Sequence, residues 1–329
     1  MTAEISLPVP ENQPTHYPHT LGELASIVRK DLSAEDRFLI TQVEGKNWRR
    51  TQLDLSNPAD RQFAARGIAL GAPVFHGFGN FVALTFHPHQ EVMRSVNAAK
   101  GRPLEQVASV TTSPEQHSAL FDWEKLPEGF DKDRTEALMT KFLDMGPFGF
   151  RGPAAAHIPE HLSYEIDGQR TVQLIAPGND CLSNDLFREA LDLSGETFLA
   201  ITSANVSKTV TGKEEPAHYK MHAIQHEFGN KAPGFVMLAH PDERKVRGLY
   251  PLHDPMSTSI IGFYESIPSE NGKPVVTIER HGSLPMAQII EVLDELGFDH
   301  KINEKAKNRL PLRKYSVVHE IFSRARESK

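Results

Sequence analysis

The chain has 329 residues, of which 36 are Lys or Arg and 43 are Asp or Glu, so its formal net charge is −7. Its length suits one large domain or two ordinary ones, and a hydrophobic content of 39% is enough for a buried core, which excludes a disordered chain. No stretch approaches the roughly 18 apolar residues of a membrane span, and the single cysteine, Cys181, excludes a disulfide framework and a cysteine-rich metal site. Because residues 1–18 resemble neither a signal peptide nor a transit peptide, we expect a soluble protein of the cytoplasm.

Few elements are predicted before residue 57. Residues 1–19 are rich in proline and are predicted to form an arm. Leu21–Leu32 is predicted as a helix with Thr20 as its cap, and Arg37–Val43 as a strand. Basic residues then gather around a tryptophan at 46–50. We treat residues 1–56 as an N-terminal extension of the main domain.

From residue 57 onward, predicted strands and helices alternate, which indicates an α/β or α+β domain with a large mixed sheet. The strands are β-branched or apolar runs bounded by Gly, Pro, Asn or Ser. They are expected at 68–76, 80–86, 106–112, 170–176, 197–202, 234–239, 257–263 and 274–279. Helices with one apolar stripe are expected at 88–99, 133–143 and 184–193, the third of them capped by Ser183, and a fourth helix is expected at 285–296, between Ser283 and the stop signal Gly297. These elements define a core domain over residues 57–297.

The last segment, residues 298–329, is predicted to be a basic helical tail. Residues 300–329 hold nine Lys or Arg against three Asp or Glu, a net charge of +6, so the other 299 residues carry −13. A basic tail on an acidic body favours a polyanionic partner, and the alternative is a helix that is only solvated.

Common nucleotide and metal motifs are absent from the sequence. It contains neither the glycine pattern of a dinucleotide fold nor a P-loop, and neither a hydrolase elbow nor a zinc-protease motif. His87 and His89 flank a proline, but alternate residues of a turn rarely converge on one ion, and no acidic or cysteine partner lies at ligand spacing. We therefore predict that the protein's own side chains hold no metal ion.

Four short polar segments remain, and each lies where a predicted strand or helix begins or ends. Lys100 and Arg102 belong to a K-G-R-P run, where two cations that point the same way suit a carboxylate, bicarbonate or phosphate. Thr202 opens T-S-A-N-V-S after an apolar strand, so hydroxyl and amide groups stand where α/β folds bind ligands. Ser257 opens S-T-S-I-I, and Arg280 opens R-H-G, where the glycine permits close approach to a phosphate. Each segment alone is also typical of an ordinary turn or helix end.

In this order and spacing the four segments resemble the YrdC-like family, the threonylcarbamoyl-AMP synthases. Members of that family carry a P-T-x-T-x-Y-G-L strand and K-G-R-P, then T-S-A-N-x-S-G, S-T-V-V-D, and R-P-G before a final helix. The resemblance covers about residues 60–296 and implies a YrdC-like twisted mixed β-sheet flanked by helices. The residues outside it form the N-terminal extension and the C-terminal tail.

The resemblance also implies a nucleotidyltransferase that uses ATP, bicarbonate, Mg²⁺ and L-threonine, forms threonylcarbamoyl-AMP and releases pyrophosphate. That product serves tRNA modification, so tRNA or a tRNA-modifying transferase is an expected partner, and a membrane is not. Lys100 and Arg102 would be catalytic, holding the carbamate and the α-phosphate while negative charge builds there. The implied nucleotide-binding residues are Lys100, Arg102, Thr202, Ser203, Asn205, Ser257 and Arg280.

The segment that would hold the amino acid departs from the family pattern. Counted back from K-G-R-P, Phe78, Asn80 and Val82 stand where the family has two threonines and a tyrosine, and these three are the candidate substrate-binding residues. Ile175 replaces the arginine of the family's V-R-V-P segment, and S-T-S-I-I lacks the final Asp of S-T-V-V-D. Since a site that loses polar partners discriminates its former substrate poorly, we expect either another amine as acceptor or impaired catalysis.

Two further hypotheses remain open. The chain is a double-stranded RNA-binding module that uses its basic tail and the 46–50 cluster, or it is a carbamoyl-transfer accessory protein that works with a partner. RNA affinity that falls with added salt tests the first, and co-purification of a partner protein tests the second.

Overall fold

The computed structural model describes residues 20–212, 215–229, 234–269 and 271–315, so the predicted arm over 1–19 and the end of the tail lie outside the described residues. The strands are β1 (Leu53–Asp54), β2 (Val74–Phe78), β3 (Phe81–Phe86), β4 (Ser109–Thr111), β5 (Phe148–Pro153), β6 (Tyr164–Ile166), β7 (Gln169–Ala176), β8 (Leu199–Ser203), β9 (Val236–Ala239), β10 (Ile260–Gly262), β11 (Val275–Arg280) and β12 (Asp299–Ile302). They form one twelve-stranded sheet in the order β1-β9-β2-β3-β8-β4-β7-β5-β10-β11-β12, with β6 paired to β7. The sheet mixes parallel pairs such as β2 with β9 and antiparallel pairs such as β3 with β8.

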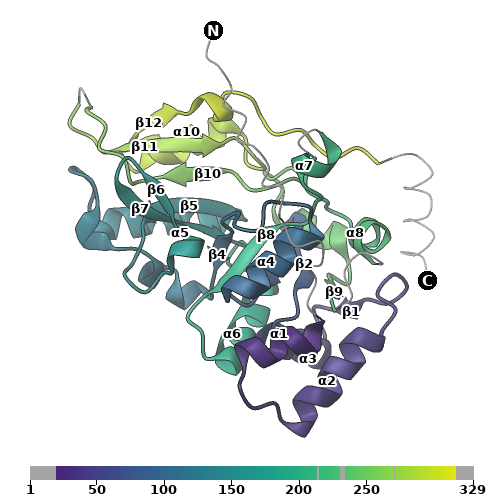
Figure 1. Cartoon of the computed structure of the whole chain (residues 1–329). Helices are drawn as coiled ribbons and strands as arrows, with labels where there is room; N and C mark the ends of the chain where they lie inside the picture. The colour runs from purple at the N-terminus through teal and green to yellow at the C-terminus, as the bar shows by residue number, and fades with distance from the viewer. Residues whose placement is uncertain (1–19, 213–214, 230–233, 270, 316–329) are drawn as a thin grey trace.

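Helices flank this sheet, so the predicted twisted mixed α/β architecture is confirmed (Figure 1). They are α1 (Leu21–Val28), α2 (Ala34–Gly45), α3 (Pro58–Ala69), α4 (Gln90–Ala99), α5 (Lys132–Met145), α6 (Ser183–Ser194), α7 (Lys208–Thr211), α8 (Met221–Phe228), α9 (Glu243–Leu249) and α10 (Met286–Glu295). In the part of the chain that the structure describes, none of the helices is long and apolar enough to cross a bilayer.

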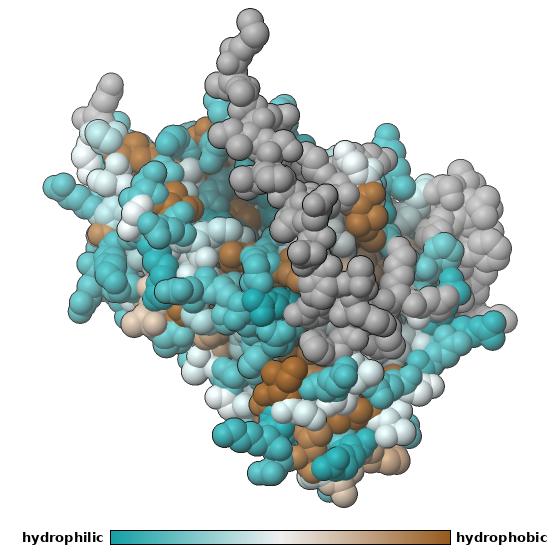
Figure 2. Space-filling model, viewed as in Figure 1, coloured by the Kyte–Doolittle hydropathy of each residue, from teal (hydrophilic) through white to brown (hydrophobic). Residues whose placement is uncertain are grey.

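The described part of the N-terminal extension packs into the same core as the sheet. Leu21, Leu24, Val43 and Trp48 are buried in one hydrophobic cluster with residues of β2, β3 and α3. The predicted cap of α1 is confirmed, because the Thr20 hydroxyl accepts the N–H of Glu23 and the Glu23 carboxylate accepts the N–H of Thr20. Figure 2 shows apolar surface over α1 and α2 on this face, and Phe38 of α2 is 67% exposed.

The predicted strand at Arg37–Val43 is wrong, because these residues lie inside α2. Ser33 and Asp36 form a capping box at the start of the helix, which satisfies backbone N–H groups that a strand would not present. Leu39, Ile40 and Val43 then face the core at helical spacing. The apolar run alone is compatible with a strand or a helix, and the capping box upstream of it favours the helix.

The predicted strand at 68–76 is wrong in its first half. Helix α3, capped by Asn57, continues to Ala69, and the chain turns at Gly71, whose φ of +88° favours glycine. Strand β2 begins only at Val74. Ser183 is likewise not a cap: it is the first residue of α6, and its hydroxyl donates to the Gly77 carbonyl.

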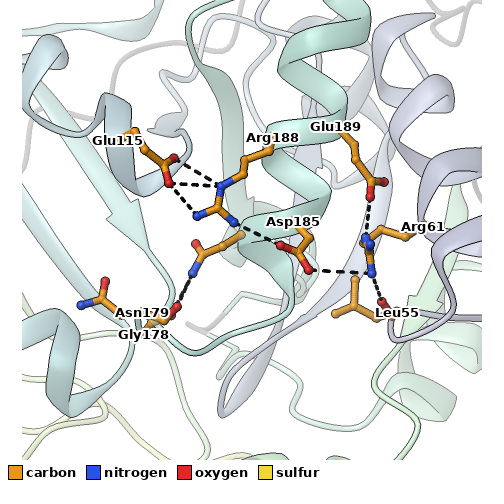
Figure 3. A network of polar contacts seen from close by, with 9 residues as sticks. Leu55, Arg61, Glu115, Gly178, Asn179, Asp185, Arg188 and Glu189 are labelled. Atoms are coloured by element: carbon orange, nitrogen blue, oxygen red, sulfur yellow. Dashed lines mark hydrogen bonds and ion pairs between the residues drawn. The ribbon is translucent and has the colours of Figure 1, made fainter.

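A charged network links α6 to α3, close to β2 (Figure 3). Arg188 lies 2.7 Å from Glu115 of the 3-10 helix η1 (Pro114–Gln116) and 3.1 Å from Asp185. Arg61 of α3 reaches Glu189 at 2.8 Å and Asp185 at 3.9 Å. The two arginines therefore connect three elements at one end of the sheet.

The described part of the basic tail is not helical, which corrects the prediction. Strand β12 pairs in parallel with β11 and is followed by a 3-10 turn, η5 (Glu304–Ala306). Residues 307–315, which we call the strap, then run without regular structure from the turn after β11 to the carbonyl of Pro216. Pro311 explains the difference, because proline in a helix interior removes a hydrogen bond and clashes with the preceding turn. Residues 316–329 lie outside the described residues.

Candidate functional site

A cavity of about 480 Å³ opens where the ends of β8 and β11 approach the strap. Its walls bring together Arg102, Ser203, Asn205, Ser257 and Arg280, five of the residues singled out by the sequence. These residues come from four segments that are far apart in the chain. Since β4, β7, β5 and β10 lie between β8 and β11 in the sheet, the segments beyond the strand ends bring these residues together.

Lys100 lies behind the cavity wall and does not line the cavity. It is fully buried, and its Nζ donates to the Ser203 carbonyl and to Thr202 Oγ1, the latter at 3.3 Å. Arg102 lines the cavity, and its Nη1 donates to the same Thr202 hydroxyl at 2.7 Å. Gly101 between them has a φ of +66°, and a Cβ there would lie 2.1 Å from a methyl carbon of Val210. This turn therefore requires glycine and places one cation beneath the wall and one in it.

Burial sets the charge states of these two cations. It lowers the pKa of Lys100 well below its ordinary value, the charge of Arg102 lowers it further, and the charge of Glu227 opposes both. Burial lowers the pKa of Arg102 to about 10. Arg102 therefore remains a cation at neutral pH and presents a guanidinium group to the cavity.

The loop after β8, residues 203–207, is held by a chain of hydrogen bonds. Ser203 Oγ donates to Asn205 Oδ1 at 2.5 Å, and Asn205 Nδ2 donates to the carbonyls of Val206 and Glu215, each at 3.1 Å. The Ser207 N–H donates to the Lys100 carbonyl at 2.9 Å, which joins this loop to the K-G-R-P turn. Two of the sequence motifs thus meet through their backbones.

The two remaining motifs are also joined to each other. Arg280 Nε donates to the Thr258 carbonyl at 2.7 Å, and its Nη2 donates to Thr258 Oγ1 at 2.8 Å. A Cβ on Gly282 would lie 2.3 Å from the Thr258 carbonyl oxygen and 2.4 Å from that of Ser257, so only glycine fits. The R-H-G turn therefore packs its backbone against the Ser257 segment and leaves Arg280 at the cavity.

The three candidate substrate-binding residues do not line this cavity. Phe78 and Val82 are buried in the core, and the Phe78 ring lies 5.2 Å from the ring of Phe81. Asn80 Nδ2 donates to the carbonyls of Asp254 and Met256, the latter at 3.2 Å. Because Met256 lines the cavity, Asn80 acts on it only through that backbone.

Sequence reasoning missed two walls of the cavity. One is the strap, which contributes Leu310 and Pro311, and the other is the stretch from Glu215 to Ala217. Arg309 holds the strap at one end, donating to the carbonyls of Gly282 and Ser283 at 3.0 and 2.6 Å. The sequence signal that could have revealed these walls is the prolines at 216 and 311, since proline favours an extended segment over a helix.

The charges on the walls suit an anion. Two guanidinium groups, Arg102 and Arg280, line the cavity, and Glu215 is the one carboxylate among its described lining residues. Glu215 lies 3.5 Å from Arg313, which offsets its charge. Over residues 20–315, apart from the short gaps, no group of three His, Cys, Asp or Glu residues could hold a metal ion.

No model of a known protein family matches the sequence, and no curated protein matches it. Solved structures do match its fold. A doubly substituted variant of Sua5 from P. abyssi matches 77% of this chain with a TM-score of 0.52 and 19% identity, and the match spans 65% of that chain, just under two thirds of its length. Sua5 from P. abyssi in complex with L-threonine matches 83% of this chain and 75% of its own, with a TM-score of 0.52 and 16% identity.

A hypothetical protein from Streptococcus mutans UA159 matches 77% of this chain over 98% of its own length, with a TM-score of 0.51 and 14% identity. At such low identities the similarity concerns the fold alone. The chain therefore has the fold of Sua5, and the YrdC-like fold that the motifs imply is confirmed.

Proposed function

We propose that this chain, which shares the fold of Sua5, is a divergent YrdC-like nucleotidyltransferase that binds ATP in the 480 Å³ cavity and transfers its adenylyl group to a small carbamate. The observation that carries the proposal is the convergence of Arg102, Ser203, Asn205 and Arg280 on that one cavity. Two fixed guanidinium groups with hydroxyl and amide groups between them suit a chain of phosphates. The other walls of the cavity include Met256, Leu310 and Pro311, which offer apolar contact to the adenine base.

The proposed reaction has two steps. The amine nitrogen of the acceptor attacks the carbon of CO₂ derived from bicarbonate, loses a proton and becomes a carbamate. A carbamate oxygen then attacks the α-phosphorus of ATP, the bond from that phosphorus to the bridging oxygen breaks, and pyrophosphate leaves. Arg102 and Arg280 stabilise the negative charge that builds on the phosphoryl oxygens, so positioning and electrostatics supply the catalysis.

Magnesium would enter this site with its substrate. The cavity offers no set of carboxylates, and Mg²⁺ is commonly bound through substrate phosphates with few protein ligands. Mg²⁺–ATP is therefore the expected nucleotide. The acceptor is a small amine, either L-threonine or another. Threonine is not singled out, because the segment that would hold it has Phe78 and Val82 buried in the core. A carbamoyl adenylate of this kind would feed threonylcarbamoyladenosine modification of tRNA.

Calorimetric titration with ATP, followed by a pyrophosphate-release assay, tests the proposal. The assay contains ATP, bicarbonate, Mg²⁺ and one amine at a time, with L-threonine among them. Arg102→Ala and Arg280→Ala should each weaken ATP binding about tenfold or more, since a hydrogen bond to a charged group contributes about 1.5–3 kcal/mol. Arg188→Ala, which changes a cation of the Figure 3 network, should bind ATP like the unaltered protein. Absence of both ATP binding and amine-stimulated pyrophosphate release would remove the proposal.

RNA binding is a second candidate function, favoured by cations that lie over two tyrosine rings at the end of the strap. The Arg247 guanidinium lies 5.7 Å from the centre of the Tyr219 ring, and Lys220 Nζ lies 5.5 Å from that of Tyr315. Aromatic faces with interleaved cations are how proteins bind single strands without sequence preference. The doubly charge-reversed variant K220E and R247E should lose affinity for a labelled RNA, and that affinity should fall as salt rises. Binding that is absent or insensitive to salt eliminates this candidate.

A further inference from the structure

Glu227, near the end of α8, contacts two segments that meet behind the cavity. Its Oε1 accepts the N–H of Val206 at 3.3 Å, in the loop that carries Ser203 and Asn205. Its Oε2 lies 2.5 Å from His218 Nε2 and 3.8 Å from Arg313 of the strap. Glu227, His218 and Arg313 do not line the cavity. Any effect they have on a ligand therefore passes through the walls that they hold.

The far end of the strap reaches Glu227 through a second path. Tyr315 Oη lies 2.9 Å from His218 Nδ1 and accepts the N–H of Tyr219 at 3.4 Å. Because a carboxylate only accepts, His218 Nε2 donates to Glu227, and Nδ1 is hydrogen-bonded to the Tyr315 hydroxyl. The order Tyr315, His218, Glu227, Val206 is thus one continuous hydrogen-bonded chain.

The charge on Glu227 agrees with this arrangement. Burial raises its pKa, but the hydrogen bond from His218 and the charges of His218 and Arg313 outweigh burial, so the pKa lies below its ordinary value. The same carboxylate opposes the lowering of the Lys100 pKa, so its charge also acts on the K-G-R-P turn. Glu227 is therefore ionised at neutral pH and acts electrostatically on both motif turns.

We propose that Glu227 is a positioning residue that couples the strap to the Ser203–Ser207 loop, so that two walls of the cavity adopt their ligand-binding geometry together. The inference rests on the proposed function for the identity of the ligand. It requires that a change at Tyr315 alters the environment of Val206 and the affinity of the cavity, although Tyr315 itself does not line the cavity.

Two variants test the coupling. Tyr315→Phe removes one hydroxyl at the end of the strap and leaves the core intact. Glu227→Gln keeps an oxygen that accepts from Val206 but removes the charge. The matched control is Glu265→Gln, because the Glu265 side chain is 20% exposed against 21% for Glu227 and also joins two segments, through Thr277 and Lys301.

The first measurement is the Kd for Mg²⁺–ATP by calorimetry on the full chain. Each of the two variants should bind about tenfold more weakly, and the double variant should bind about as weakly as either one, because both changes break the same chain of bonds. Glu265→Gln should retain the Kd of the unaltered protein. A loss in the double variant equal to the product of the two single losses would overturn the coupling.

The second measurement is amide hydrogen exchange of the peptide containing Val206 in the ligand-free protein. Exchange there should be faster in Tyr315→Phe than in the unaltered protein and unchanged in Glu265→Gln. If the unaltered protein fails to bind ATP, the proposed function fails while the exchange result still decides the coupling. If exchange at Val206 is the same in Tyr315→Phe as in the unaltered protein, the inference is refuted.

Discussion

Replacement of Lys100 by methionine tests what a fully buried ammonium group contributes beneath a ligand cavity. Lys100 Nζ donates to the Ser203 carbonyl and the Thr202 hydroxyl, and its whole side chain is shielded from water. Methionine has a similar length and volume, fits irregular gaps, and carries no charge. Lys100→Met therefore separates the charge from the packing, whereas Lys100→Ala removes both.

The expected stability of Lys100→Met follows from two opposing contributions. Loss of two hydrogen bonds from a charged donor costs about 1.5–3 kcal/mol each. Relief of desolvation offsets part of that loss, because burial lowers the pKa of Lys100 well below its ordinary value. We expect the two contributions nearly to cancel, which leaves the free energy of unfolding within about 1.5 kcal/mol of the unaltered protein. Lys100→Ala also opens a cavity and should cost about 2–5 kcal/mol.

Urea unfolding followed by circular dichroism measures these differences, and pyrophosphate release measures the catalytic part. Under the proposed function, Lys100→Met should be nearly as stable as the unaltered protein yet about tenfold or more slower, since it no longer donates to the Ser203 carbonyl and to the Thr202 hydroxyl that also binds Arg102. If Lys100→Met is as destabilised as Lys100→Ala, the bonds to the end of β8 outweigh desolvation and the reasoning about charge is refuted. Unchanged pyrophosphate release would remove Lys100 from the catalytic residues.

Three further predictions concern stability. Gly282→Ala should lose about 1–3 kcal/mol and several degrees in Tm by thermal shift, because its Cβ would lie 2.3 Å from the Thr258 carbonyl oxygen; an unchanged Tm would contradict the packing at this turn. Burial lowers the pKa of five histidines from 6.5 to about 3 or 4, so the unfolded chain takes up protons at a higher pH than the folded chain does. The free energy of unfolding should therefore fall between pH 6.5 and pH 4, by up to about 1.4 kcal/mol per pH unit for each histidine. A free energy of unfolding that does not change with pH in urea titrations would refute this. These histidines are His76, His87, His117, His240 and His253. Arg188→Ala should lower the free energy of unfolding by less than about 1 kcal/mol, because the side chains of Arg188 and Glu115 are 43% and 61% exposed. A loss above about 2 kcal/mol would show that the Figure 3 network stabilises the fold.

The sequence was informative where local patterns decide the structure. The helices α4 and α5 were predicted from single apolar stripes and α10 from its start and stop signals, and most of the predicted strands are present in the sheet. Strand β5 was not predicted, since its run of Phe148–Pro153 contains two glycines and ends in proline. Tertiary packing requires these glycines. A Cβ on Gly149, for example, would lie 2.7 Å from Ile260 of the neighbouring strand β10. No property of the segment alone reveals that approach.

In the candidate site, too, the residues that belong to local motifs were predicted and those that depend on distant contacts were not. Arg102, Ser203, Asn205, Ser257 and Arg280 were found by motif, and the structure places all five on one cavity. Motifs do not distinguish a side chain in the wall from one behind it, so Lys100 and Thr202 were grouped with the lining residues. Leu310 and Pro311 were missed because their role depends on contacts with residues such as His281, which lie far back in the chain.

The strap has a consequence for how the protein comes into being. On the ribosome, the segments that carry Arg102, Ser203 and Arg280 emerge before Leu310 and Pro311, so much of the sheet can assemble while the cavity still lacks one side. Docking of the strap on Gly282 and on the carbonyl of Pro216 closes contacts that span 27 and 97 residues, and it can follow only after the other walls of the cavity have been synthesised. The wall that the strap contributes is therefore completed last, after the segments that form the other walls of the cavity.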